Sequence, residues 1–404
     1  MQKRIWQLSL FSFLVAAFTG FLYRYGLFYP LPGDLGFANI RHAHSHLMFF
    51  NWITPPLLSW MVAALGDGEN EKTPAGLKPC LYTMIGLGFL SYPLFLLFGY
   101  HAVPVASLRL PLAAIISGLV MITWYWFAVL WYVNRRQSSN RPALVFFDAA
   151  LVTLLISSLG AWGVSVFQFT DIDNPLFATS MTHFFLGVFT EGWVTLGVLG
   201  LIWDRAEVPA SELRSGWLWN PILFGSMLVF PFSLNRALLT PSMLIAAYAG
   251  LILISISLIL NLRLMYRHNI FHTFLLKTTG LLLTIKAAAL IIAVMPVDIW
   301  PGEQGVRILY LHIHLLGIAS LTLIDRFHPL QDRLAKIVFS LCVLSVLLTL
   351  AMISGYWPAW LMPPGVYTWV TVAALLPLLP GIWLWFRTFS IQPSNFKKEK
   401  SPSL

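Results

Sequence analysis

Charged residues are scarce in this chain of 404 residues: they make up 10% of it, whereas 58% is hydrophobic. A soluble globular protein carries roughly 25% charged residues, so the composition excludes an ordinary soluble enzyme. Cysteine is nearly absent as well. Cys80 and Cys342 lie far apart and form no CxxC or CxxCH motif. The sequence therefore indicates no disulfide framework, no zinc site and no covalently attached c-type haem.

Acidic residues are the rarer of the two kinds of charge. Aspartate and glutamate number 16 against 25 lysines and arginines, which gives a net charge of +9. In a membrane protein such an excess follows from the enrichment of Lys and Arg in cytoplasmic loops. The basic balance therefore predicts contact with a lipid bilayer and no nucleic-acid partner.

Long apolar runs are abundant. Runs of roughly 20 residues suit a helix crossing a ~30 Å hydrocarbon core, whereas barrel strands are ~10 residues long and alternate in polarity. We therefore expect an all-α polytopic membrane protein with about twelve transmembrane helices. Residues 1–390 would form a single transmembrane domain, and residues 391–404 a disordered cytoplasmic tail. The expected spans are 5–27, 41–64, 80–100, 108–133, 143–168, 178–203, 217–235, 240–262, 272–295, 306–325, 334–356 and 365–387.

The distribution of Lys and Arg predicts the orientation. One set of loops holds most of the basic residues, from Lys3 and Arg4 to the lysines of residues 397–400. The opposite set holds mainly Arg41, Arg109, Arg236 and Arg307. By the positive-inside rule both termini are cytoplasmic, and the expected location is a bacterial inner membrane.

Histidines recur in the second, sixth and tenth expected spans. His44 precedes His183 by 139 residues, and His183 precedes His314 by 131. In the expected orientation these spans all descend from the outer surface, and each histidine lies about 5–12 Å below it at 1.5 Å per residue. An ionisable side chain inside a membrane is costly and is by default a functional candidate. The spacing suggests three four-helix pseudo-repeats, each of which places a histidine at the same depth in the membrane.

The histidine pairs suit two cofactors better than one ion. His312 and His314 are two residues apart, about 200° around a helix, and so point to opposite sides. Two such histidines form a poor single-metal site, but each can offer one axial ligand to a different haem.

These motifs resemble the catalytic subunit of the haem–copper oxidase and nitric oxide reductase superfamily. Residues 41–47, Arg-His-Ala-His-Ser-His-Leu, resemble the Arg-x-x-His-Thr-Asn-Leu run of the reductases' second helix. Residues 312–314, His-Ile-His, resemble the His-x-His of the tenth helix, and Glu191-Gly192 resembles the reductases' Glu-Gly. The resemblance covers the whole chain in topology but rests on motifs in two helices and a partial match in a third.

The resemblance implies a set of roles. His44 and His314 would be the axial pair of a low-spin b-type haem, and His312 the ligand of a second, high-spin haem. Arg41 and Arg307, at the outer ends of their helices, would meet haem propionates. The protein would transfer electrons or bind a diatomic gas, with electrons coming from a partner subunit or from quinol.

The chain also departs from the family. The family's metal-binding histidine four residues before Glu-Gly is replaced by Gly187, and the seventh span holds no histidine. His183 lies eight residues before Glu191, about 12 Å along a helix, so the two cannot share one ion. Copper is therefore not expected, and neither is reduction of oxygen or nitric oxide of the known kind.

Other functions remain open at this stage. An oxidoreductase with a reorganised site would use His312 and Glu191, the candidate catalytic residue. A cofactor-free transporter would move protons through the histidines and Lys286, which lies too deep in its helix to reach the surface. Glu191 is a candidate carboxylate partner for Lys286. His183 is a further candidate metal ligand. Alternatively, Glu191 makes a structural hydrogen bond, His183 meets lipid headgroups, and Arg41 and Arg307 are ordinary interfacial arginines.

Overall fold

The computed structural model describes residues 1–33, 35–65, 74–135, 141–170, 174–206, 208–295, 304–327 and 332–390. The tail predicted to be disordered, residues 391–404, lies outside this range. Within it the chain is almost entirely helical, with a single two-stranded hairpin. Eleven helices of the described residues are long and apolar enough to cross a membrane. The prediction of an all-α polytopic membrane protein is confirmed.

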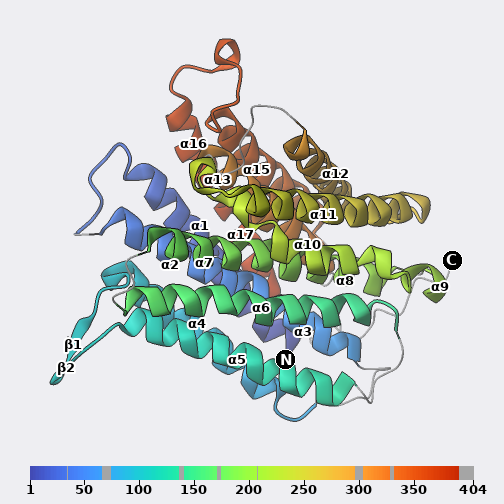
Figure 1. The fold of residues 1–404 in the computed structure, drawn as a ribbon, viewed down its shortest axis with the longest axis horizontal. Coiled ribbons are helices and arrows are strands. Elements are labelled where there is room, and N and C mark those ends of the chain that lie inside the picture. Colours follow the sequence, from blue (N-terminus) through green and yellow to red (C-terminus); the bar gives the residue numbers. More distant parts are fainter. Residues whose placement is uncertain are drawn as a thin grey trace. The chain divides into compact units, whose positions relative to one another are not determined.

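The chain divides into two compact units. Unit 1 comprises Met1–Ser139, Arg326–Val346 and Tyr367–Leu404, and unit 2 comprises Asn140–Asp325 and Leu347–Val366. Figure 1 shows the elements of both units, coloured in order of sequence from blue to red.

Unit 1 is built around the first helices. Helix α1 packs on α2 and on α17, while α4 packs on α2 and α5 (Figure 1). The strands β1 and β2 are antiparallel and project beyond the ends of α4 and α5 (Figure 1). The elements are α1 (Gln2–Tyr25), α2 (Phe37–Leu47), η1 (Met48–Ile53), α3 (Thr54–Leu65), α4 (Leu77–Phe98), β1 (Val103–Val105), β2 (Leu108–Leu110), α5 (Leu112–Arg135), α15 (Arg333–Met352, which continues into unit 2), α16 (Val366–Leu375) and α17 (Leu378–Ser390).

In unit 2, α6 packs on α7, and α10 on α11, which in turn packs on α12 (Figure 1). The elements are α6 (Leu144–Gln168), α7 (Pro175–Gly187), η2 (Val188–Val194), α8 (Thr195–Arg205), α9 (Ala210–Leu213), η3 (Gly216–Leu218), α10 (Asn220–Leu228), η4 (Phe230–Ser233), η5 (Arg236–Leu238), α11 (Pro241–Arg267), α12 (Phe274–Val294), α13 (Gln304–His312), η6 (Ile313–Ala319), α14 (Ser320–Arg326, whose last residue belongs to unit 1) and η7 (Ala359–Leu361).

Side-chain caps and glycines explain how the helices of unit 2 begin and approach one another. Thr240 and Thr273 accept hydrogen bonds from the backbone N–H of the third residue of α11 and α12, respectively, as N-cap residues do. A Cβ on Gly225 would lie 2.7 Å from the carbonyl oxygen of Gly250. Only glycine permits this approach of α10 to α11, in keeping with the small residues found where membrane helices pack closely.

The seventh expected span is wrong as a continuous helix. Residues 217–235 form the nine-residue helix α10 and the 3-10 segment η4. The segment still runs the length of unit 2, since Leu218 O accepts from Asn261 near the end of α11 and Ser233 O accepts from Arg307 in α13. Pro231 explains the break, because proline lacks an N–H donor and clashes with the preceding turn of an α-helix.

Three long helices contain a π-helical segment, and they are the second, sixth and tenth expected spans. These segments are η1, η2 and η6. Each holds a buried polar side chain, namely Asn51, Glu191 or His314. A π-helical segment inside an α-helix carries an extra residue per turn and often marks a functional site. The recurrence in every fourth span accords with the suggested pseudo-repeats, which themselves stay a prediction.

Candidate functional site

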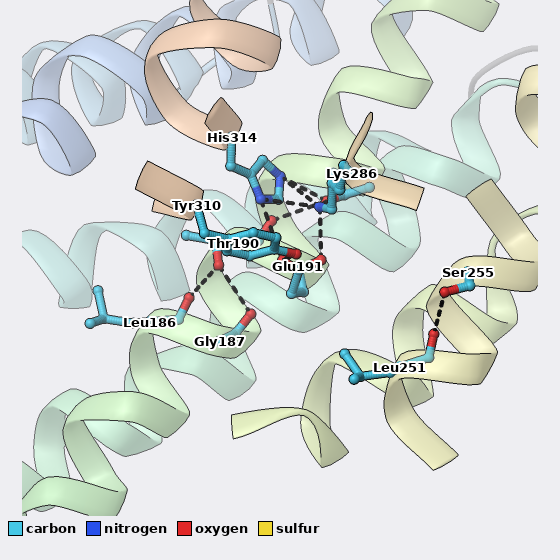
Figure 2. A network of polar contacts seen from close by, with 10 residues as sticks. Leu186, Gly187, Thr190, Glu191, Leu251, Ser255, Lys286, Tyr310 and His314 are labelled. Atoms are coloured by element: carbon cyan, nitrogen blue, oxygen red, sulfur yellow. Dashed lines mark hydrogen bonds and ion pairs between the residues drawn. The ribbon is translucent and has the colours of Figure 1, made fainter. Parts of the chain in front are cut away.

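A buried cluster of ionisable side chains lies inside unit 2. Glu191 comes from η2, Lys286 from α12 and His314 from η6 (Figure 2). Their exposed fractions are 2%, 1% and 1%. Lys286 Nζ lies 2.8 Å from Glu191 Oε2. The expectation that Glu191 is the carboxylate partner of Lys286 is therefore confirmed.

The Lys286 ammonium contacts three acceptors. Besides Glu191, Nζ lies 3.2 Å from Thr195 Oγ1 and 3.1 Å from His314 Nδ1. The 2.8 Å contact with Glu191 is an ion pair rather than a well-directed hydrogen bond, since Oε2 has no hydrogen-bond donor at a favourable angle. The ammonium is therefore surrounded by one carboxylate, one hydroxyl and one imidazole.

His314 contacts several members of the cluster. Thr195 Oγ1 donates to the carbonyl of Thr190 at 3.1 Å and lies 2.9 Å from His314 Nε2. Lys286 Nζ lies at nearly the same distance from both ring nitrogens, 3.1 Å from Nδ1 and 3.3 Å from Nε2. Nδ1 also lies 3.5 Å from Glu191 Oε1. The imidazole is thus in contact with a hydroxyl, an ammonium and a carboxylate.

Tyr310 completes the cluster. Its hydroxyl donates to Glu191 Oε1 at 2.5 Å, and its ring centroid lies 5.9 Å from Lys286 Nζ (Figure 2). Sequence reasoning missed Tyr310 and Thr195, although a signal was present. Tyr310 precedes His314 by four residues and Thr195 follows Glu191 by four, a spacing that places side chains on one face of a helix.

His183 and Arg307 meet in unit 2, away from the ion pair. Arg307 Nη1 lies 3.3 Å from His183 Nε2 and 3.2 Å from the carbonyl oxygen of Ser233. His183 is 7% exposed, and its Nδ1 has no hydrogen-bond partner among the described residues. The structure brings these two predicted site residues together, and it brings Glu191 together with His314.

The second histidine of the tenth span has a different environment from His314. His312 is half-buried, and its Nδ1 lies 2.7 Å from the carbonyl oxygen of Ile308 in the preceding turn. This contact lies on its own helix, whereas His314 contacts Lys286 of α12, in line with the expected divergence of the two imidazoles.

In unit 1, His44 contacts α1. Its Nδ1 lies 2.7 Å from the carbonyl oxygen of Ala16, and a Cβ on Gly20 would lie 3.1 Å from His44 Cε1. The glycine thus makes room for the imidazole. His46 stacks on Phe95 at 3.9 Å between ring centroids, while Arg41 is exposed.

The histidines can be compared with the geometry of known metal ligands. A metal-ligating histidine usually donates one ring N–H to a carbonyl or carboxylate, which directs its other nitrogen to the metal. His44 and His312 fit an axial ligand of haem in this respect, because Nδ1 of each meets a backbone carbonyl. His314 differs, since both of its ring nitrogens contact side chains of the cluster: Nε2 lies 2.9 Å from Thr195 Oγ1, and Nδ1 lies 3.1 Å from Lys286 Nζ. The pairing of His44 with His314 stays a prediction.

No multi-histidine metal site is found among the described residues. In that part of the chain no three His, Cys, Asp or Glu side chains lie close enough to hold one ion. Gly187 stands where the resembling family has a metal-binding histidine. A Cβ at this position would lie 3.5 Å from Phe230 Cβ. A side chain larger than alanine there would meet η4.

No family model matches the chain, and no curated protein matches it. The resemblance to the haem–copper superfamily therefore stays a prediction from motifs, and the geometry of the site is the main basis for a functional proposal.

Proposed function

We propose that this chain is a membrane haem protein that binds b-type haem through His44 and through His312. Bound haem would supply a redox-active iron for electron transfer or for binding a diatomic gas such as nitric oxide or oxygen. The observation that supports the proposal best is the anchoring of both imidazoles: each Nδ1 lies 2.7 Å from a backbone carbonyl oxygen, that of Ala16 or Ile308. This anchoring directs Nε2 outward, as a metal ligand requires.

The remaining predicted residues take supporting roles in the proposal. Arg41 and Arg307 are cations on the helices that carry His44 and His312, which suits them to propionate carboxylates. Electrons would come from a partner subunit or from quinol. The protein would lie in a bacterial inner membrane with both termini cytoplasmic. An enzyme of the oxidoreductase class is the variant of this proposal in which Glu191 takes part in catalysis.

Absorption spectra of the purified protein test the proposal. We expect a Soret band and sharp bands in the reduced form, and two haems per chain if both histidines bind iron. His44→Ala and His312→Ala should each remove part of the haem. His42→Ala is the matched control, because His42 lies on the same helix as His44 and packs against Tyr100, 5.0 Å between ring centroids. Protein that is folded and purified after growth with haem yet shows no Soret band would refute the proposal.

A second candidate function is a cofactor-free, proton-coupled transporter. The observation that favours it is the Glu191–Lys286 ion pair with His314 and Tyr310, because ionisable groups within spanning helices mark proton and ion pathways. If haem is absent, uptake of a pH-sensitive dye into proteoliposomes decides. We expect proton movement that Lys286→Met abolishes and that His42→Ala leaves intact.

A further inference from the structure

The environment of the Lys286 ammonium is that of a bound cation. A carboxylate oxygen and a hydroxyl oxygen lie 2.8 and 3.2 Å from Nζ, and the two nitrogens of one imidazole lie 3.1 and 3.3 Å from it. Glu191 in η2 and Thr195 in α8 lie four residues apart on one continuous helix, and His314 in η6 follows Thr195 by 119 residues. Carboxylate, hydroxyl and imidazole are also groups that coordinate divalent transition metals.

We propose that Lys286 is a tethered cation that occupies a built cation site formed by Glu191, Thr195 and His314, in the place a divalent metal ion would take. The ammonium of Lys286 supplies the positive charge that neutralises the buried carboxylate of Glu191. The lysine side chain fills the space that a metal ion would need. This inference does not depend on haem binding, since the cluster contains neither His44 nor His312.

The distances support the comparison with a metal ion. Ammonium contacts of 2.8–3.2 Å exceed metal–ligand bonds of about 2.0–2.2 Å, so each ligand would have to move by about 1 Å. The imidazole of His314 would also have to turn so that one of its nitrogens faces the ion, because Nζ lies near both of them. The π-helical segments carry two of the ligands, and the surplus residue in each offers a way to adjust side-chain direction without breaking a span.

The difference in length between a lysine and a histidine side chain at position 286 allows a direct test of the proposed cation site. An imidazole at position 286 is shorter than the lysyl chain by roughly one metal–nitrogen bond of about 2 Å. A metal held by such an imidazole would lie close to the place that Nζ occupies now. With Glu191 and His314 it would have two histidines and one carboxylate, a ligand set that binds divalent iron and its neighbours.

The experiment uses Lys286→His in the full chain, produced in medium supplemented with Co²⁺ or Zn²⁺. We expect stoichiometric cobalt or zinc by elemental analysis and a higher unfolding temperature in the presence of the metal. The wild-type protein should hold neither metal. Haem iron is counted separately, so a failure of the haem proposal and a failure of this one are distinguishable.

Two variants control the experiment. Lys277→His adds a histidine at an exposed position of the same helix α12 and should acquire no metal. Adding Glu191→Gln to Lys286→His removes the carboxylate ligand and should abolish the metal binding.

Each outcome bears on the proposal. If Lys286→His accumulates only when metal is supplied, folding is coupled to metal binding, and the proposal is supported. A variant that folds without cobalt or zinc bound, or that fails to accumulate with or without them, overturns it. Cobalt or zinc in the wild-type protein, lost on Glu191→Gln, would also overturn it, because the ammonium would then not exclude the metal.

Discussion

At the scale of single residues, Lys286 and Glu191 depend on each other. Both side chains are removed from solvent, with exposed fractions of 1% and 2%. Removing one member of a buried ion pair leaves an uncompensated charge, whereas replacing both by neutral groups is often tolerated. The polar partners of the pair, Thr195, Tyr310 and His314, further restrict which replacements the site accepts.

Lys286→Met therefore should destabilise the protein by about 3–5 kcal/mol, the usual effect of breaking a buried pair from one side. The double variant Lys286→Met/Glu191→Gln should recover most of this loss, because glutamine is neutral and still accepts from Tyr310. Thermal unfolding in detergent, followed by helical circular dichroism, measures the effect for each single variant and for the double variant. Additive losses would show that the two charges do not act as a pair.

How far the sequence predicts the site depends on the kind of information each residue carries. Lys286 was identifiable as needing a carboxylate because lysine in the middle of an apolar helix is costly. The choice of His314 as its neighbour was not predictable, since contacts between η6 and α12 depend on helix rotation. The π-helical segments change that rotation, and no residue pattern in the chain predicts where they occur.

At the scale of elements, the sequence predicts most helices and misses the irregular ones. Apolar runs of the right length locate eleven spans of the described residues to within a few residues. The exception is the seventh expected span, residues 217–235, which is apolar but contains Pro221 and Pro231. Proline starts α10 and ends it, as expected of a residue that fits the first helical turn and disrupts the interior.

Glycine shows at the same scale where the helices cannot move apart. A Cβ on Gly192 in η2 would lie 2.6 Å from Thr153 Cβ in α6 and 2.9 Å from Ser226 Oγ in α10. Gly192→Ala should therefore destabilise the protein by about 1–3 kcal/mol, as overpacking does. The loss would appear as a lower unfolding temperature in detergent.

The matched control is Gly86→Ala in α4. A Cβ on Gly86 meets nothing within 4 Å, so this change should be neutral or stabilise the helix by up to about 1 kcal/mol. Equal effects of the two substitutions would mean that the approach of α6 and α10 to η2 does not limit packing.

At the scale of the whole molecule, the seventh span decides on which side of the membrane the chain ends. Eleven crossings would place the termini on opposite sides, and twelve on the same side. The contacts of Leu218 with Asn261 and of Ser233 with Arg307 extend residues 217–235 along the length of unit 2. The loops that contain Arg109 and Arg236 hold few other basic residues. Because cytoplasmic loops are enriched in Lys and Arg, both loops are expected outside the cytoplasm, as twelve crossings require.

Alkaline phosphatase fused to truncated chains tests this topology, since the enzyme is active only outside the cytoplasm. We expect activity after Ala106, in the turn between β1 and β2, and after Leu239, between η5 and α11. Fusions after Asn269 and Ser390 should be inactive, and green fluorescent protein at the same two places should fluoresce. An inactive fusion at Leu239 with an active one at Asn269 would mean that residues 217–235 do not cross. In that case Leu218 would lie at the cytoplasmic end of unit 2 and Asn261 near the outer end, contrary to the hydrogen bond between them.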